Sequence, residues 1–472
     1  MKFLLINPAI GKQRLPAYFP LGLGYIAQIL LEEGHDVSVL DINAYRWSDD
    51  EVKQQLRNAK FEAVGITGMV TEFNAVQQLS KLIKEINPNA PIILGGGLAT
   101  AFPQIVLERT QVDIVVVGEG EVTIKELAES LDGCSSLGKV KGICYKTKNN
   151  IYTTQPRELI RDLDTIPFPA RHLFPMERYF RNPVPYLRMF DPRVIPANMI
   201  TSRGCPYRCT YCFHGLWGYH FRARSADNVV AEMKFLHRKY GVTGIFFMDD
   251  TFVLDRERVL AICDRLIQEG LNIIWAASGR VNLMDREMLE KMRAAGCRAI
   301  LYGIESGSQK ILNEMRKGVT VEQARQAVLN TWQAGILPVG YLMIGMFGET
   351  SQTVEETIRF CNETGLISGF SYATPFPGTE LYIKAIEIGK IQPESADQLL
   401  ERWGEWGDEI LVNLSNIPTE KLKSIKRNAE RRILWGNLLR KVPLYIQVLG
   451  LPNFVREGGR FFKKQLRVGK FT

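Results

Sequence analysis

The sequence has 472 residues but only 8 cysteines, and none of them lies before Cys134. Three of the eight fall within the segment from Cys205 to Cys212, and the other five are scattered singly. Secreted disulfide frameworks spread paired cysteines along a short chain, so this pattern excludes a disulfide framework. Clustered cysteines in a long chain instead favour a metal site in a reducing compartment. The sequence therefore predicts a cytoplasmic protein.

Long apolar segments are also scarce. The apolar run at the N-terminus is too short for the core of a signal peptide and better fits a buried first strand. One uncharged stretch, residues 326–348, is long enough to resemble a membrane span, but Gly335 and Pro338 interrupt it. It predicts a helix that ends near Gly335, followed by a strand from Val339 to Ile344.

The composition lacks any sign of disorder or of a fibrous repeat, since 46% of the residues are hydrophobic and 23% are charged. A chain of this length exceeds one ordinary hydrophobic core. It therefore predicts a globular protein of two or three domains.

The net charge of +8 is unevenly distributed. Residues 421–472 contain fourteen basic and two acidic residues, so this tail carries +12 and residues 1–420 carry −4. A nucleic-acid partner is therefore not expected for the chain. The basic tail also contains aromatic residues, and it favours either peripheral contact with an anionic membrane or a solvated helical face packed on the body.

Residues 1–140 alternate strand and helix patterns five times, which predicts an α/β domain with a doubly wound parallel sheet. The strand patterns are short runs rich in Val and Ile, as a sheet buried on both faces requires. They cover residues 3–7, 36–42, 63–67, 91–95 and 113–118.

Glycine-rich loops follow three of these strands, at the sheet edge where such domains bind ligands. Each loop taken alone is also compatible with an ordinary turn between strand and helix. The sequence has neither a GxGxxG fingerprint with a following acid nor a GxxxxGK[ST] loop, so a nucleotide site is disfavoured. The candidate ligand contacts are Gly65, Thr67, Gly68, Thr71, Gly95, Gly96, Gly97, Gly118, Glu119 and Gly120.

A proline-rich connector is expected at residues 141–197, and the strand–helix alternation then resumes over residues 198–385. Six consecutive units predict a partial (β/α)6 barrel with its chemistry at the C-terminal ends of the strands. The predicted strands are 198–202, 244–248, 273–277, 299–304, 339–344 and 369–373. Residues 386–472 are expected to be mainly helical and basic.

The three clustered cysteines, Cys205, Cys209 and Cys212, follow the first predicted barrel strand with the spacing C-x3-C-x2-C. Structural zinc usually takes four ligands arranged as two separated pairs. A 4Fe–4S cube held by three thiolates keeps one iron open to a ligand from outside the protein. His214 could complete a zinc site, but no matching second pair is present, so the cluster is favoured.

This motif at the end of the first strand of a six-unit barrel resembles the radical S-adenosylmethionine (SAM) superfamily, over roughly residues 198–382. The resemblance implies that the three cysteines hold a 4Fe–4S cluster whose open iron chelates SAM. It also implies that one electron cleaves SAM to a radical that abstracts hydrogen from an unactivated carbon. An electron donor of the flavodoxin or ferredoxin type is then expected.

The same resemblance assigns SAM contacts to the ends of later strands. Two adjacent carboxylates after the second strand suit the SAM amine, although a helix N-cap is an equal alternative for the second of them. Groups after the third and fourth strands are expected near the carboxylate, ribose and adenine. The predicted SAM contacts are Tyr211, Asp249, Asp250, Ser278, Arg280 and Glu305.

A doubly wound domain followed by this barrel resembles the cobalamin-binding branch of the superfamily, across roughly residues 1–385. The three glycine-rich loops stand where that branch accepts the corrin and its nucleotide tail. Many cobalamin domains carry Asp-x-His-x-x-Gly, whose histidine ligates cobalt. This sequence has no such motif, and its His35 lies between a helix and a strand.

The resemblance implies a cobalamin-dependent enzyme that functionalises an unactivated carbon of a small-molecule or lipid substrate. Methyl transfer is the leading reaction, and oxidative cyclisation with the same cofactors is the alternative. A tRNA methylthiotransferase is disfavoured because such enzymes carry further cysteines in the N-terminal domain. A cobalamin sensor is disfavoured because it needs no reductive cluster.

Overall fold

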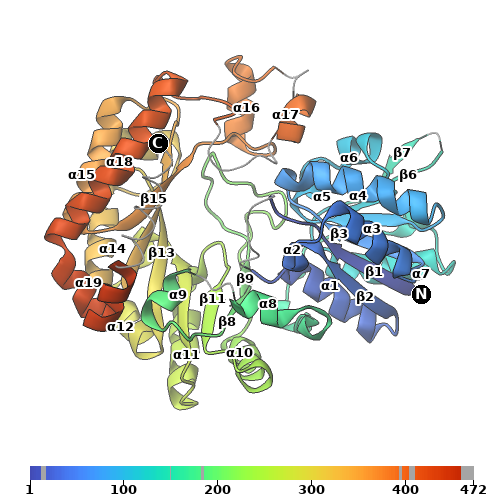
Figure 1. Ribbon diagram of the computed structural model, residues 1–472, viewed down its shortest axis with the longest axis horizontal. Helices are drawn as coiled ribbons and strands as arrows, with labels where there is room; N and C mark the ends of the chain where they lie inside the picture. The colour runs from blue at the N-terminus through green and yellow to red at the C-terminus, as the bar shows by residue number, and fades with distance from the viewer. Residues whose placement is uncertain (12–17, 149, 182–184, 393–395, 403–409, 459–472) are drawn as a thin grey trace.

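Two mostly parallel sheets organise the chain, and their central strands are short runs rich in Val, Ile and Leu that are buried on both faces. The computed structural model describes residues 1–11, 18–148, 150–181, 185–392, 396–402 and 410–458. In Figure 1 the N-terminal sheet lies on one side and the second sheet on the other, with the connector between them. The predicted fold class is confirmed: an α/β domain, a partial barrel and a mainly helical C-terminal region.

The N-terminal sheet has seven strands in the order β2-β1-β3-β4-β5-β6-β7. The first five strands are parallel, as predicted, and the last two form an antiparallel hairpin at the edge. The sheet therefore extends beyond residue 140, where the sequence pattern placed the start of the connector. The strands are β1 Lys2–Asn7, β2 Asp36–Asp41, β3 Ala63–Thr67, β4 Ile92–Gly95, β5 Ile114–Val116, β6 Ile143–Lys146 and β7 Ile151–Thr153.

Side-chain alternation along the strands divides this domain into two hydrophobic layers. Phe3 and Leu5 of β1 pack with α1 and α7, whereas Leu4 and Ile6 pack on the opposite face with α3, α4 and α6. The helices are α1 Leu21–Glu32, α2 Ile42–Tyr45, α3 Asp49–Asn58, α4 Phe73–Ile86, α5 Gly97–Ala101, α6 Pro103–Arg109 and α7 Glu121–Leu131.

The second sheet has six parallel strands in the order β8-β11-β12-β13-β14-β15, which is the order expected for an open barrel. Its strands are β8 Pro196–Met199, β11 Gly244–Phe247, β12 Ile274–Gly279, β13 Cys297–Glu305, β14 Leu337–Ile344 and β15 Ile367–Tyr372. Its helices are α10 Ala226–Tyr240, α11 Arg256–Gln268, α12 Arg286–Ala294, α13 Gln309–Glu314, α14 Val321–Gln333 and α15 Ser351–Thr364.

The connector carries two short helices, α8 Met176–Arg181 and α9 Pro185–Phe190. Helix α9 contacts β12 and β13, and its Leu187 is fully buried in the barrel core. The connector is therefore part of the barrel packing and does more than join the two domains.

The C-terminal region consists of α16 Glu380–Glu387, α17 Ala396–Arg402, α18 Thr419–Arg440 and α19 Val442–Leu449. Helix α18 packs along α15 and β15, and Arg432 forms an ion pair with Glu355 of α15 at 2.6 Å. No helix among the described residues combines the length and the hydrophobicity of a membrane span. Basic residues beyond 458, on which part of the predicted tail charge falls, lie outside the described residues.

Candidate active site

The three clustered cysteines lie in a loop that is closed at its base by a small antiparallel ribbon. Strand β9 (Ser202–Arg203) pairs with β10 (Arg222–Ala223), and residues 204–221 between them form what we call the cysteine loop. Gly204 adopts a φ of +82°, and a Cβ there would lie 2.3 Å from the carbonyl oxygen of His220. Only glycine allows the base of the loop to close in this way.

The cysteine side chains are unpaired thiols of graded exposure. Cys209 is buried, while Cys205 and Cys212 are partly exposed. A hydrogen bond from Cys212 lowers the pKa of Cys209, and the positive charges of Lys317 and Arg280 act in the same direction, whereas the same contact raises the pKa of Cys212. The two thiols thus share a proton, and Cys209 is the one whose thiolate is favoured.

The donor set fits a multi-iron cluster better than a single metal ion. Among the described residues, no three His, Cys, Asp or Glu side chains are placed to hold one ion together. His214, which the zinc alternative needs, stacks on Tyr219 with 4.3 Å between ring centres, and its Nε2 is buried without a hydrogen-bond partner. Three thiolates from one loop fit the 4Fe–4S cluster that leaves one iron open.

A charged triad adjoins the loop at the end of the fourth barrel strand. Tyr211 donates its hydroxyl hydrogen to Glu305 at 3.0 Å, and Lys317 lies 2.9 Å from the Tyr211 hydroxyl and 3.2 Å from Glu305. Glu305 has a φ of +64° and sits at a bulge between β13 and β14. A non-glycine residue rarely adopts this conformation, and such strain is concentrated at functional sites.

Lys317 is a site residue that the sequence patterns missed. It follows helix α13 and has no motif of its own, and it reaches Glu305 because the chain turns back there through Arg316, whose φ is +49°. One indirect signal for it was present in the sequence: Glu305, an acid expected in the site, had no assigned basic partner.

The predicted contact Arg280 also lies beside the cysteine loop. Its guanidinium stacks on the ring of Tyr207 at 3.4 Å and donates to the carbonyl oxygen of Lys317. Its Nε is buried without a hydrogen-bond partner among the described residues. An unpaired buried donor of this kind suits an anionic ligand such as the SAM carboxylate. Ser278, also predicted there, is half-buried near the C-terminal end of β12.

The two adjacent carboxylates after β11 have different environments. Asp249 is buried and accepts hydrogen bonds from the Thr201 backbone, the Thr201 hydroxyl and the Ser202 hydroxyl at 2.6–2.7 Å. Asp250 is accessible, although desolvation and the neighbouring Asp249 raise its pKa to about 6. Asp249 therefore fastens the segment that leads into the cysteine loop, and Asp250 is the carboxylate left available to a cation.

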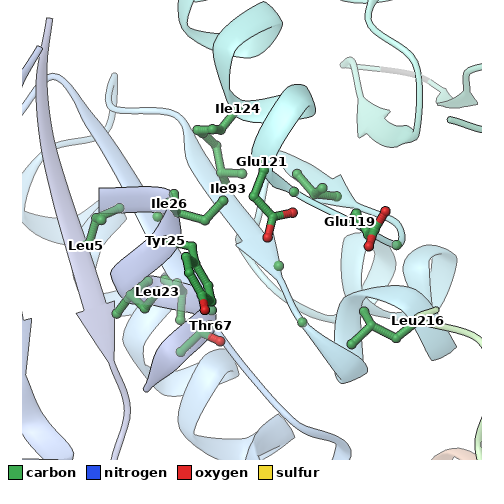
Figure 2. Close-up of a pocket in the computed structure, with 18 of the residues that line it drawn as sticks. Leu5, Leu23, Tyr25, Ile26, Thr67, Ile93, Glu119, Glu121, Ile124 and Leu216 are labelled. Carbon is green, nitrogen blue, oxygen red and sulfur yellow. The ribbon is translucent and has the colours of Figure 1, made fainter. Parts of the chain in front are cut away.

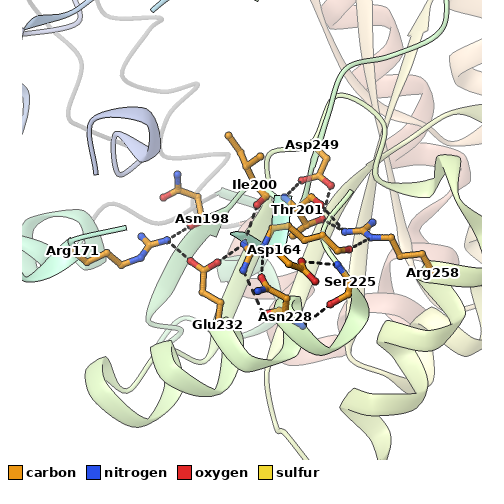
Figure 3. Close-up of polar contacts among 11 residues, drawn as sticks. Asp164, Arg171, Asn198, Ile200, Thr201, Ser225, Asn228, Glu232, Asp249 and Arg258 are labelled. Atoms are coloured by element: carbon orange, nitrogen blue, oxygen red, sulfur yellow. Dashed lines mark hydrogen bonds and ion pairs between the residues drawn. The ribbon is translucent and has the colours of Figure 1, made fainter. Parts of the chain in front are cut away.

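A buried polar network holds the start of the cysteine loop in place (Figure 3). Arg258 donates to the hydroxyl of Thr201 at 2.6 Å, and the same hydroxyl donates to Asp249. Farther along, Arg171 donates to the carbonyl oxygen of Asn198 at 2.7 Å and pairs with Glu232 at 3.3 Å. Because these groups come from the connector, α10 and α11, three elements fix the end of β8.

A cavity of about 250 Å³ lies between the N-terminal sheet and helices α1 and α7 (Figure 2). Its wall is mainly apolar, and Glu119, Glu121 and Arg203 are its charged residues. Among the predicted ligand contacts, Gly68, Thr71 and Gly97 do not line it. Those that line it are Gly65, Thr67, Gly95, Gly96, Gly118, Glu119 and Gly120.

Two of these glycines allow close packing of the cavity wall. A Cβ on Gly65 would lie 2.7 Å from Leu5, and one on Gly120 would lie 3.1 Å from Ile26. The apolar wall and glycine edges could hold the nucleotide tail of cobalamin. His35 does not line the cavity: its Nδ1 lies 3.3 Å from the N-terminal amine, and its ring packs edge-on against Phe3 at 5.2 Å.

The cavity also receives residues from the second domain. Ile200 and Arg203 precede the first cysteine, and Leu216 and Trp217 belong to the cysteine loop itself. Figure 2 shows Leu216 at the rim, opposite Tyr25 of α1. The segment that carries the cluster ligands and the predicted cobalamin loops therefore share one wall.

Comparison with known proteins agrees with this two-domain arrangement. Residues 199–361 match the family model of the radical SAM superfamily, and residues 10–128 match that of the B12 binding domain. A protein of Pyrococcus horikoshii described as an uncharacterized methyltransferase is 35% identical over 437 residues, covering 91% of each chain. The cytidylyl-2-hydroxyethylphosphonate methyltransferase of Streptomyces wedmorensis is 29% identical, covering 84% of this chain and 83% of its own.

Among solved structures, the radical SAM methyltransferase TsrM from Kitasatospora setae has a TM-score of 0.70 at 22% identity, covering 82% of this chain and 76% of that chain. The fold, the cysteine loop and the glycine-lined cavity together define an enzyme with two cofactor-binding domains. The chain belongs to the cobalamin-binding branch of the radical SAM superfamily. Its cofactors are accordingly a 4Fe–4S cluster, SAM and cobalamin.

Proposed function

We propose that this enzyme transfers a methyl group to an unactivated carbon of a small-molecule substrate. The observation that carries the proposal is the shared wall: Arg203, Leu216 and Trp217 of the radical SAM domain line the cavity of the cobalamin domain. Radical generation and a methyl donor are thereby brought to one place. When bound, the cluster and SAM supply the radical, and cobalamin supplies the methyl group.

The residues of the chain bind and orient these groups. Cys205, Cys209 and Cys212 hold the cluster. Asp250 receives the SAM amine, and Arg280 receives its carboxylate through the unpaired Nε. The Tyr211–Glu305–Lys317 triad then borders the remainder of SAM, with Lys317 fixing the Glu305 carboxylate at 3.2 Å. Ser278 completes this set of proposed contacts.

The cobalamin contacts are assigned to two groups. The glycine edges and the apolar wall of the cavity hold the nucleotide tail. The rest of the cofactor lies outside the cavity and is contacted by residues at or beside the same loops, namely Gly68, Thr71 and Gly97. Since no histidine is among the described residues that line the cavity, we propose that cobalamin binds without a protein imidazole on cobalt. The reductant is proposed to be a flavodoxin or ferredoxin.

Oxidative cyclisation is the alternative reaction within the same branch. The anaerobic magnesium-protoporphyrin IX monomethyl ester cyclase of Rubrivivax gelatinosus is 27% identical to this chain, covering 81% of this chain and 69% of its own. Methyl-labelled SAM distinguishes the two reactions. Methyl transfer requires that the reconstituted, reduced enzyme pass the label to its own cobalamin, as detected by mass spectrometry. SAM cleavage without labelled methylcobalamin would contradict methyl transfer and favour the cyclase reaction.

Peripheral membrane contact is not favoured for the described part of the tail. Helices α18 and α19 pack on the barrel, where Tyr445 is buried and donates to the carbonyl oxygen of Gly365 at 3.1 Å. Arg432 is engaged by Glu355. We therefore propose that the described part of the tail is a solvated helical face packed on the body.

A further inference from the structure

Two arginines face each other at the base of the cysteine loop. Arg203 of β9 and Arg222 of β10 are direct partners in the antiparallel ribbon, and both side chains are more than nine-tenths buried. Like charges directly opposite one another on a ribbon repel, and burial increases the cost. The ribbon that closes the loop therefore needs negative charge from elsewhere.

The negative charge comes from the cobalamin domain. Glu119 accepts from Arg203 and from Arg222 at 2.8 Å each, and Glu121 accepts from the second terminal nitrogen of Arg203. The two carboxylates are 2% and 9% exposed, so solvent screens these pairs little. Two buried cations are thus balanced by two buried anions that lie 82 to 103 residues earlier in the chain.

Further hydrogen bonds fasten this cluster to the connector. The backbone N–H of Ile160 donates to Glu119 at 2.7 Å, and Arg222 donates to the carbonyl oxygen of Ile160 at 2.6 Å. Trp217 of the cysteine loop and Tyr25 of α1 each lie 5.9 Å from the Arg203 guanidinium. The four charged side chains therefore sit where cobalamin domain, connector and cysteine loop meet.

The same residues border the cavity. Glu119, Glu121 and Arg203 line it, and Gly118 and Gly120 on either side of Glu119 form part of its edge. Arg203 is also only two residues before Cys205. A displacement of the glycine-rich loop would therefore separate the carboxylates from their arginines and loosen the base of the cysteine loop.

We propose that Glu119, Glu121, Arg203 and Arg222 are positioning residues that couple the two cofactor sites, so that cluster assembly and cobalamin binding strengthen each other. The proposal rests on the cofactor assignment but not on methyl transfer. Cluster assembly orders the cysteine loop, which holds the arginines against the glycine-rich loop and preforms the cavity. Because linkage is reciprocal, bound cobalamin then favours the ordered cysteine loop by the same factor.

Hydroxocobalamin titration tests the coupling. Its Kd is measured by absorbance for the reconstituted enzyme and for the cluster-free C205A/C209A/C212A protein. The cluster-loaded enzyme should bind about tenfold more tightly, within the usual range of coupling between sites. E121Q removes one anion but keeps a hydrogen-bond acceptor for Arg203, and it should bring this ratio close to one.

Two further variants distinguish a positioning role from direct contact with cobalamin. Arg222 does not line the cavity, yet R222Q should also lower the ratio because it leaves the carboxylates in excess. E126Q is the matched control: Glu126 lies on the same helix as Glu121 but pairs with Arg157 of the connector, so the ratio should stay at the wild-type value. Circular dichroism confirms that each variant is folded.

A spectroscopic readout is independent of affinity. The electron paramagnetic resonance signal of the reduced cluster, recorded with saturating cobalamin under the same reductant, should shift relative to the cobalamin-free sample in wild type and E126Q, and not in E121Q or R222Q. A ratio of one in wild type, or an unchanged ratio in E121Q and R222Q, would overturn the coupling. If wild type bound no hydroxocobalamin, the coupling and the cofactor assignment would both fail, whereas the methyl-label experiment tests methyl transfer separately.

Discussion

The ammonium of Lys317 lies 3.2 Å from the carboxylate of Glu305, and both side chains are about nine-tenths buried. Glu305 is also one of the few non-glycine residues of the described chain with a positive φ. The ion pair, together with the hydrogen bond from Tyr211, holds this strained position beside the cysteine loop. The pair therefore combines a strained backbone position with a buried charge beside the proposed SAM site.

Removing the cation of this pair should weaken SAM binding. In K317M, Glu305 would keep a buried charge without its partner and would turn from the position that Lys317 fixes. A hydrogen bond to a charged group contributes about 1.5–3 kcal/mol, so the Kd for SAM should rise roughly tenfold to a hundredfold. Equilibrium binding and 5′-deoxyadenosine formation measure the effect. K317R should retain most of the affinity, and K310M, at an exposed lysine of α13, should match wild type.

Gly303 should tolerate no side chain, because the same ion pair occupies the space. A Cβ at Gly303 would lie 2.5 Å from Glu305 Oε1 and 2.8 Å from Lys317 Nζ. G303A should lower the free energy of unfolding by about 2 kcal/mol and weaken SAM binding. Gly369 on β15 has no atom within 4 Å of its ideal Cβ, so G369A should leave both unchanged. Equal melting temperatures of the two variants would contradict this account.

The sequence patterns were sufficient for most of the fold, because hydrophobic periodicity determines it. The fourth barrel strand was predicted at residues 299–304 and lies at Cys297–Glu305. The helix and strand predicted in place of a membrane span are α14 and β14. The β6–β7 hairpin was missed because its strands have only four and three residues and are separated by a polar segment, without a longer apolar run.

Contacts within the site were less predictable, since they depend on tertiary geometry. Lys317 reaches Glu305 only through a bulge and a left-handed residue, neither of which has a sequence signal here. The different roles of Asp249 and Asp250 depend on which hydroxyls lie nearby. The pairing of Arg203 with Glu119 depends on how two domains dock, which no local pattern records.

Cluster assembly should depend on the three clustered cysteines and on no other cysteine. Anaerobic reconstitution should give about four irons per chain in wild type and almost none in C205A/C209A/C212A. C134A replaces an exposed cysteine that lies outside the cysteine loop, so its iron content should equal that of wild type. Iron and sulfide analysis with the absorbance spectrum measures this. Loss of iron in C134A would contradict the assignment.

Filling the cavity should block cobalamin without unfolding the domain. Ile124 projects from α7 into the cavity (Figure 2), and I124W would occupy part of its 250 Å³. A steric cost of about 1–3 kcal/mol corresponds to roughly fivefold to 150-fold weaker binding of hydroxocobalamin. I124L conserves the volume and should bind like wild type. Normal binding by a folded I124W protein would place cobalamin outside this cavity.

Glu72 should make stability depend on pH. Its side chain is 4% exposed and Oε1 has no hydrogen-bond partner, so burial raises its pKa from 4.5 to about 7, although the Met69 N–H bond lowers it in part. The folded state therefore retains a proton that the unfolded state releases, and stability falls as pH rises from about 4.5 to 7. By pH 8 the loss should reach about 3 kcal/mol. In urea unfolding, E72Q should gain stability over wild type by about this amount between pH 4 and 8, whereas E85Q, at an exposed position of α4, should show no such trend. Parallel curves for wild type and E72Q would show that the pKa of Glu72 is the same in the folded and the unfolded protein.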